Sequence, residues 1–193
     1  MRRSIRQRIG FALAAVCLIG TATMGAENKA TRSVVGYTVP QVELVRDDGK
    51  TVSLPEELND GRPVVMSFIF TSCTTICPLL TQTLARLQDA LGPDRDRVHI
   101  VSITLDPEED TPERLTEYAK DFHAGPEWQH YTGTVKSIIT TTRAFNVDRG
   151  DKMSHTPVIL LRAAPGKPWI RFDGFATATE LLQELRSVIA ASK

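Results

Sequence analysis

Two cysteines four positions apart, Cys73 and Cys77, are the residues of this sequence best suited to chemistry. They follow the apolar run 64–70, which has the character of a buried strand, and Pro78 comes next, where the first turn of a helix tolerates proline. Positions i and i+4 of a helix lie about 6 Å apart on one face, a separation that a disulfide can close. We therefore expect the pair to form a disulfide or to bind a soft metal ion. A helix N-terminus beside it would favour thiolate over thiol.

A purely structural disulfide between these cysteines is the weaker alternative. The loop it would close is so short that little entropy would be removed from the unfolded chain. The remaining cysteine, Cys17, lies in an apolar segment and is interpreted as hydrophobic filling, so in an exported protein Cys73 and Cys77 have only each other. The arrangement favours a redox-active pair or a metal site over a structural crosslink.

Residues 1–26 have the composition of an export signal. Residues 1–8 are rich in arginine and contain no acid, and residues 9–20 form an apolar core. That core is short of the roughly 20 residues that a membrane-spanning helix needs. We therefore expect cleavage near residue 22 or 26, with an uncleaved membrane anchor as the alternative. The protein is expected in the periplasm, touching the membrane only through this segment if it is retained.

The rest of the chain is expected to form one domain. Its 193 residues are 41% hydrophobic and 24% charged, which is ordinary for a globular protein. Residues 27–36 are polar and predict a flexible leader, so the domain is placed at 37–193. Without residues 1–26 the chain has 19 basic against 23 acidic residues, and it shows no basic patch that would indicate nucleic acid as a partner.

Apolar patterns predict a strand, a helix and a strand around the cysteines, and hence a parallel crossover unit. A hairpin with an Asp-Gly turn precedes this unit, and a helix capped by Asp110 or Thr111 follows it. The order predicts an α/β, thioredoxin-like fold with an added N-terminal β-hairpin. The further expected elements are strands at 39–45, 50–54, 98–105 and 128–131, helices after Pro78 and at 134–142, a polar loop at 146–153, a hairpin at 156–161 and 169–172, and a last helix after the capping box Thr177–Glu180.

Over residues 37–190 the sequence resembles the Sco/SenC family. The resemblance is carried by Cys-x-x-x-Cys-Pro after a strand, by the stretch 105–113, and by a lone His155 before a strand. It implies a thioredoxin fold that binds one copper ion, Cu(I) or Cu(II), through Cys73, Cys77 and His155. Thiolates suit Cu(I), and imidazole extends the site to Cu(II). The implied partner is a copper-accepting respiratory enzyme subunit, or its assembly factors, during assembly of the dinuclear copper centre of cytochrome c oxidase.

The chain departs from the pattern of family members that load the oxidase. These usually carry an aspartate inside the cysteine motif and another before the histidine, whereas this chain has Thr74-Thr75-Ile76 and Ser154. Such carboxylates would orient the ligands, so the departure bears on oxidase loading more than on copper binding. Thioredoxins also place a cis-proline against their cysteines, and by that likeness we expect Pro157 to be cis and near Cys73.

Two other functional hypotheses remain open. The first is a periplasmic thiol–disulfide oxidoreductase or peroxidase-like protein without an obligate metal, in which Cys73 and Cys77 form the catalytic pair. Whether the chain is an enzyme therefore depends on whether thiol exchange or copper transfer is its main role, and replacement of His155 would separate the two. The second is an interaction module that uses the fold only as a scaffold.

The remaining polar candidates are expected to be structural. His99, His123 and His130 are interpreted as surface or packing histidines, and Met153 as a gap-filling side chain. The four acidic residues of the 106–110 loop could bind a cation, but solvation and helix capping explain them more simply: Asp106, Glu108, Glu109 and Asp110.

Overall fold

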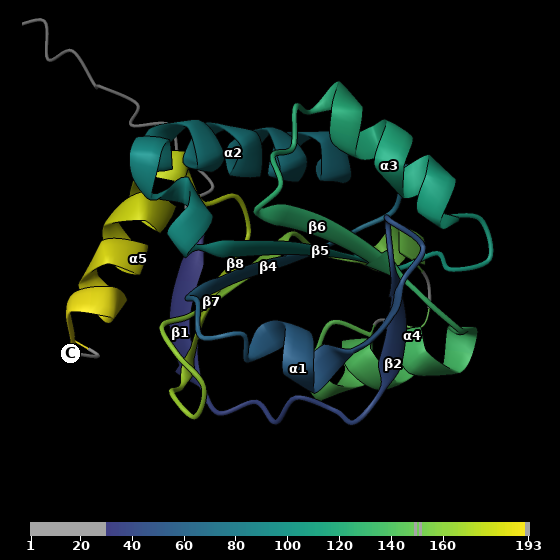
Figure 1. Ribbon diagram of the computed structural model, residues 1–193, viewed down its shortest axis with the longest axis horizontal. Helices are drawn as coiled ribbons and strands as arrows, with labels where there is room; N and C mark the ends of the chain where they lie inside the picture. Colours follow the sequence, from purple (N-terminus) through teal and green to yellow (C-terminus); the bar gives the residue numbers. More distant parts are fainter. Residues whose placement is uncertain (1–29, 149, 151, 192–193) are drawn as a thin grey trace, which may run out of the picture.

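The computed structural model describes residues 30–148, 150 and 152–191. These residues form one eight-stranded sheet with helices on both faces (Figure 1). The strand order across the sheet is β1-β8-β7-β4-β5-β6-β2-β3. The predicted export signal and Cys17 lie outside the described residues. The strands are β1 (Thr31–Val35), β2 (Glu43–Arg46), β3 (Thr51–Ser53), β4 (Val64–Ile69), β5 (His99–Thr104), β6 (Trp128–Thr132), β7 (Val158–Arg162) and β8 (Trp169–Asp173). The helices are α1 (Leu54–Leu58), α2 (Ile76–Leu91), α3 (Pro112–Asp121), α4 (Val135–Ala144) and α5 (Ala178–Ala191), with short 3-10 turns η1 (Gly92–Arg97) and η2 (Lys152–Ser154).

At the centre of the sheet, three chain segments meet at the same end of the strands. Strands β4 and β5 are buried at every position and pair in parallel, with Ile69 opposite Thr104. Strand β7 pairs with β4 in the antiparallel direction, with Ser67 opposite Ile159. The carboxyl ends of β4 and β5 therefore lie beside the amino end of β7, and the loops attached to these ends meet.

Helices cover both faces of the sheet. Helices α2, α3 and α5 lie on one face, and α1 and α4 on the other (Figure 1). The predicted leucine stripe docks α2 on the sheet, because Leu80, Leu84, Leu87 and Leu91 are all buried in the same cluster as strand residues. Gly92, with φ of 55°, ends the helix as expected.

The predicted N-terminal hairpin is confirmed, with a shorter first strand. Strands β2 and β3 pair in the antiparallel direction around Asp48-Gly49, where Gly49 has φ of 81°, and β2 extends the sheet by pairing with β6. The first strand begins at Glu43 instead of residue 39. A tight turn, in which the amide of Val42 donates to the carbonyl of Pro40 at 3.0 Å, occupies the residues before it.

The prediction of a flexible leader over residues 27–36 is wrong for residues 31–35. These form the edge strand β1, which pairs with β8 along its whole length. Arg32 also forms a bidentate ion pair with Glu184 of α5, at 2.7 Å. The composition misled because an edge strand needs few buried side chains when its backbone bonds a neighbouring strand.

The caps of two helices test the cap predictions. The Thr111 hydroxyl accepts from the amide of Arg114 at 3.3 Å and caps α3, whereas Asp110 makes other bonds. The Thr177–Glu180 capping box is confirmed, since the amide of Glu180 donates to the Thr177 hydroxyl at 3.2 Å and the amide of Thr177 donates to the Glu180 carboxylate at 2.9 Å. Within the described part of the chain, no helix is both long enough and apolar enough to cross a bilayer.

Docking of α2 on the sheet gives the first testable prediction. Leu84→Ala removes a fully buried side chain and leaves a cavity, so we expect the free energy of unfolding to fall by about 2–5 kcal/mol. Urea denaturation followed by circular dichroism measures this change. The matched control is Gln82→Ala on the exposed face of the same helix, which should change stability by less than about 0.5 kcal/mol. Equal effects of the two substitutions would contradict the assigned face.

Candidate functional site

The two cysteines lie where β4 passes into α2. Cys77 is the second residue of the helix, but Cys73 lies in the loop before it, so the expectation that both occupy one helical face is wrong. They meet because the loop folds back: the amide of Cys73 donates to the carbonyl of Phe70 at 3.2 Å. The amide of Cys77 in turn donates to the sulfur of Cys73 at 3.3 Å. Both side chains are buried and are free thiols.

The surroundings give the two thiols opposite acidities. Burial alone would raise the pKa of Cys73, but bonds from the backbone of Cys77, Thr75 and Ile76 and from the Cys77 thiol outweigh it, so the pKa is lowered. Burial is the main cause that raises the pKa of the Cys77 thiol, and the negative charges of Cys73 and Asp110 act in the same direction. Cys73 is therefore the more acidic thiol of the pair and Cys77 the less acidic one.

His155 lies next to Cys77, although it is 78 positions further along the chain. Its Nε2 lies 4.0 Å from the sulfur of Cys77, and only 5% of the residue is exposed. Its ring packs edge-on against Phe70, with centroids 5.8 Å apart. Burial lowers the pKa of the imidazole, which favours the neutral form that can offer a nitrogen lone pair to a metal.

Cys73, Cys77 and His155 lie in contact one after the other, but they do not yet have the arrangement of a complete metal site. Among residues 30–148, 150 and 152–191, no three histidine, cysteine, aspartate or glutamate side chains already converge on one metal position. For a metal such as zinc, bonds to sulfur and imidazole nitrogen are about 2.3 Å and about 2.0 Å long, so two such donors on one ion lie roughly 3.5–4.3 Å apart. The 4.0 Å between Cys77 and His155 falls within that range.

Asp110 is a buried residue of the site that sequence reasoning missed. Its side chain is fully buried and accepts from the amide of Thr71 at 3.1 Å and from its hydroxyl at 2.5 Å. It also accepts from the hydroxyl of Thr104 at 2.5 Å. The prediction that Asp110 is solvated or caps α3 is therefore wrong: it anchors the start of the cysteine loop. Its donors, Thr71 and Thr104, lie near the ends of the two parallel strands, and no local sequence pattern marks Asp110 as their acceptor.

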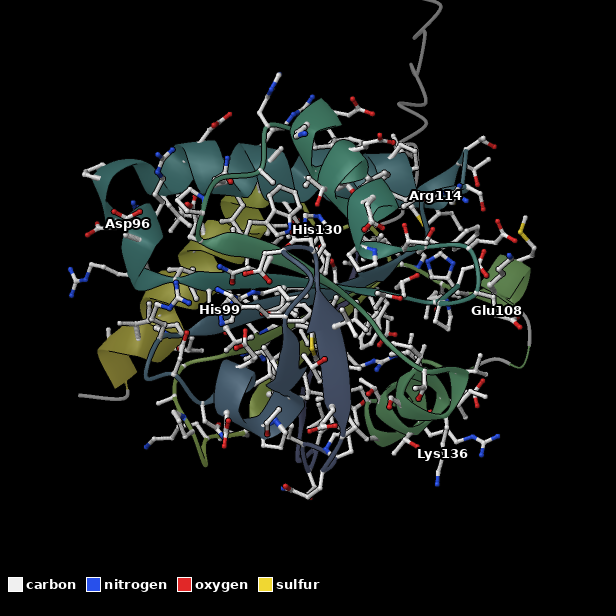
Figure 2. The ribbon with its side chains drawn as sticks, turned by 45° about the vertical axis from the view of Figure 1, so that its right-hand side comes forward. Asp96, His99, Glu108, Arg114, His130 and Lys136 are labelled. Carbon is white, nitrogen blue, oxygen red and sulfur yellow. The ribbon has the colours of Figure 1, made fainter. Side chains whose placement is uncertain are left out.

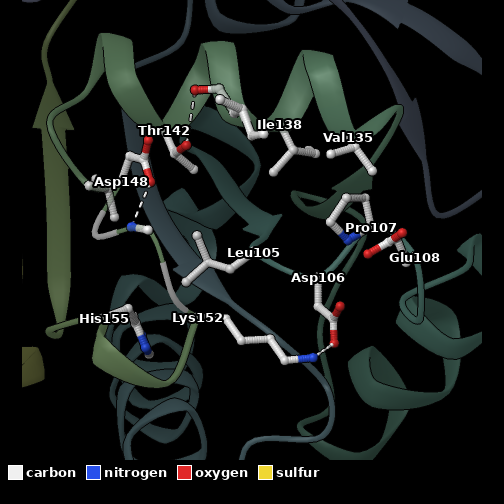
Figure 3. Close-up of a pocket in the computed structure, with 13 residues that line it drawn as sticks. Leu105, Asp106, Pro107, Glu108, Val135, Ile138, Thr142, Asp148, Lys152 and His155 are labelled. Carbon is white, nitrogen blue, oxygen red and sulfur yellow. Dashed lines mark hydrogen bonds and ion pairs between the residues drawn. The ribbon is translucent and has the colours of Figure 1, made fainter.

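Asp106 and Lys152 form a second missed feature, on the histidine side of the site. Asp106 is only 6% exposed, and its carboxylate pairs with the ammonium group of Lys152 (Figure 3). The ammonium group also lies over the ring of Phe70, 5.7 Å from its centroid. Met153, next in the chain, is 70% exposed, so its predicted gap-filling role is wrong.

A cavity of about 370 Å³ borders the site. Asp106, Lys152 and His155 lie on one side of it and helix α4 on the other, with Val135, Ile138 and Thr142 facing the space (Figure 3). His155 therefore lines this cavity, whereas Cys77 is not among the lining residues and belongs to the apolar cluster under α2.

The other histidines have the structural roles expected of them. His99 and His130 lie inside the molecule on β5 and β6, whereas Asp96, Arg114 and Lys136 project from its outside (Figure 2). His99 lies 3.2 Å from Asp60, and His130 stacks on Trp128. His123 is exposed and adopts a positive φ of 55°.

The expectation of a cis-proline before β7 is wrong. The peptide bond preceding Pro157 is trans. Pro157 leads directly into β7, and its carbonyl accepts from the amide of Gly174 at 2.9 Å. An extended entry into a strand is compatible with the trans form that peptide bonds prefer.

Comparison with known proteins places this geometry in a family. The SCO1/SenC family model matches residues 32–190. The SCO1 protein homolog of Bacillus subtilis is 36% identical over 106 residues, which cover 54% of this chain and 54% of that protein. The matched stretch thus spans about half the length of this relative.

Two solved structures resemble the chain more completely. Arabidopsis thaliana ScoI, solved with copper bound, has a TM-score of 0.67 and 28% identity, covering 80% of this chain and 99% of that one. BsSco, described as a member of the Sco family of cytochrome c oxidase assembly proteins with a disulfide switch, has a TM-score of 0.68 and 27% identity, covering 81% and 95%. The predicted thioredoxin-like fold is confirmed by these likenesses. Because the family model covers most of the sequence, from β1 to α5, the chain belongs to the SCO1/SenC family.

Proposed function

We propose that this chain is a copper carrier that binds one copper ion through Cys73, Cys77 and His155 and delivers it during assembly of a respiratory copper enzyme such as cytochrome c oxidase. The observation that carries the proposal is the 4.0 Å contact between the sulfur of Cys77 and Nε2 of His155, two residues that are 78 positions apart. The family resemblance alone names the same residues, but the contact is independent support for them.

The donor set fits the ion. Two thiolates select Cu(I), and an added imidazole makes the site acceptable to Cu(II) as well, so a bound copper could exist in either oxidation state. The lowered pKa of Cys73 makes its proton the easier of the two to lose, and binding of copper would also displace the proton of Cys77, whose pKa is raised. His155 is neutral where copper would meet it, because burial lowers the pKa of its ring.

The relatives support both parts of the proposal. The Arabidopsis thaliana protein was solved with copper bound, and BsSco is described as belonging to cytochrome c oxidase assembly proteins. The copper acceptor of this chain would be a respiratory enzyme subunit or one of its assembly factors. The export signal proposed for residues 1–26 would place the domain in the periplasm, cleaved or tethered to the inner membrane.

Thiol–disulfide exchange is the second candidate, and the unequal acidities of the cysteines favour it. The Cys73 thiolate would attack a substrate disulfide and release one substrate thiolate, forming a mixed disulfide. Cys77, once deprotonated, would attack the Cys73 sulfur and release the second substrate thiolate. The substrate is released as a dithiol, and Cys73 and Cys77 are left joined by a disulfide. Reduction of a partner's cysteines in this way could also prepare them for copper.

Replacement of His155 distinguishes the two candidates. His155→Ala should lower Cu(II) affinity by more than the roughly 10- to 100-fold typical of losing a residue that only orients a ligand, because a ligand itself is lost. Its rate of thiol–disulfide exchange should change far less. Competition titration against a chelator measures the first quantity, and reduction of a model disulfide the second.

The control for this experiment is His123→Asn, at an exposed histidine whose positive φ asparagine tolerates. It should bind copper as the unaltered protein does. Loss of exchange in the His155 variant with copper binding intact would reverse the order of the two candidates.

Thiol reactivity in the reduced, metal-free protein provides another prediction. Iodoacetamide should modify Cys73 before Cys77, and the pH midpoint of the Cys73 reaction should lie below the roughly 8.5 of a free cysteine. Mass spectrometry of peptides after timed quenching gives both rates. Cys77→Ala removes the thiol that donates to Cys73 and should move the midpoint upward. Faster modification of Cys77 would contradict the assigned acidities.

A further inference from the structure

The two halves of the site are carried by separate loops. The cysteines belong to the loop that joins β4 to α2, and His155 to the segment between α4 and β7. Among the described residues, Cys77 and Phe70 contact the His155 ring, and Lys152 lies over Phe70. A residue group that bonds to both segments would help to set the separation between them.

A third loop, residues 105–111 between β5 and α3, bonds to each of the two. Asp110 at its far end holds Thr71, two positions before Cys73, by its amide and its hydroxyl. Asp106 at its near end pairs with Lys152, three positions before His155. Both carboxylates are at least nine-tenths buried, so the surrounding residues restrict their movement.

The loop is internally braced between these two ends. The amide of Asp106 donates to the Thr104 hydroxyl at 2.8 Å, and that hydroxyl donates to Asp110 at 2.5 Å. The amide of Asp110 donates to the carbonyl of Asp106 at 2.8 Å. The two ends of the loop are therefore joined to each other by short, buried hydrogen bonds.

On the histidine side, Lys152 fixes the turn that presents the ring. The carbonyl of Lys152 accepts from the amide of His155 at 3.3 Å, within the turn η2. Its ammonium group is held between the carboxylate of Asp106 and the face of Phe70, the same ring against which His155 packs. Anchoring Lys152 therefore restricts both the backbone and the ring of His155.

We propose that the 105–111 loop is a bracket that sets the distance between the cysteine pair and His155, with Asp110 positioning the cysteines and the Asp106–Lys152 ion pair positioning the histidine. These are positioning residues and would not touch copper. The effect of the bracket on copper binding rests on the proposed function. The contacts that form the bracket do not, because they are present in the metal-free protein.

Lys152→Met tests the histidine side of the bracket. It keeps an apolar chain over Phe70 but removes the charge that Asp106 binds, and a side chain that is 36% exposed can be changed without a large loss of packing. Hydrogen exchange of the His155 amide should become at least about 10-fold faster in the metal-free protein. Cu(II) affinity should fall about 10- to 100-fold, as for loss of an outer partner, while Cu(I) affinity at the two thiolates changes less than about 3-fold.

Lys152→Arg is the matched control, because it keeps the charge and can still reach a carboxylate. It should restore slow exchange at His155 and the Cu(II) affinity. Failure of arginine to restore them would assign the effect to packing and overturn the role of the ion pair. Equal losses of Cu(I) and Cu(II) affinity, or unchanged exchange at His155, would also overturn the proposal.

The cysteine side is tested with Thr71→Val and Thr71→Ser. Valine has the shape of threonine without the hydroxyl that Asp110 binds, and serine keeps the hydroxyl. We expect valine to shift the alkylation rate of Cys73 at least about 3-fold and serine to leave it unchanged, with exchange at His155 unaffected by either. Indistinguishable Cys73 alkylation rates in the two variants would overturn the role of Asp110 on the cysteine side.

If the unaltered protein binds no copper, the proposed function fails, while hydrogen exchange at His155 and alkylation of Cys73 still decide whether the bracket exists.

Discussion

The pairing of β4 with β5 on one side and β7 on the other is the constraint on which the site depends. Parallel pairing puts the ends of β4 and β5 at one edge, and antiparallel pairing brings the start of β7 to the same edge. Residues from three distant parts of the chain thereby meet: Cys73 and Cys77, the 105–111 loop, and His155. A slip of one position in any of these pairings would turn the buried side chains of a strand to the opposite face and separate the loops.

Within that frame, burial differentiates two chemically identical thiols. Cys73 precedes the helix and receives amide donors from its first residues, whereas Cys77 is inside the helix and faces the apolar cluster beneath it. The first position stabilises a thiolate and the second penalises one. The same asymmetry suits both candidate functions, because it gives one more acidic thiol, as nucleophile or first ligand, and one sulfur that reacts second. His155 is therefore the residue that separates a metal site from a purely thiol one.

The sequence predicted the parts of this molecule that depend on local pattern. The strand–helix–strand unit, both hairpins and the capping box at Thr177 follow from periodicity and turn chemistry, and His155 came from resemblance. The misses at β1, Asp110 and Asp106 depend on long-range contacts. Strand β1 has little apolar content and is defined by its pairing with β8. Asp110 and Thr71 are 39 positions apart, and Asp106 and Lys152 are 46 apart, so no local pattern distinguishes these carboxylates from the exposed Glu108 and Glu109 beside them. The helical face assigned to Cys73 failed because the loop, instead of the helix, sets its position.

The buried carboxylates also bear on the departures from the family pattern. This chain has threonines inside the cysteine motif and Ser154 before the histidine, where an aspartate would act directly on the neighbouring ligand. Its nearby carboxylates come instead from the 105–111 loop, and both are engaged: Asp110 by Thr71 and Thr104, Asp106 by Lys152. The negative charge of Asp110 thus opposes ionisation of Cys77, while the hydrogen bonds and the ion pair occupy the carboxylates of Asp110 and Asp106. Orientation of the donors in this chain therefore rests on the backbone positions of two loops more than on side chains adjacent to the ligands. That arrangement makes the rigidity of the 105–111 loop a determinant of the site.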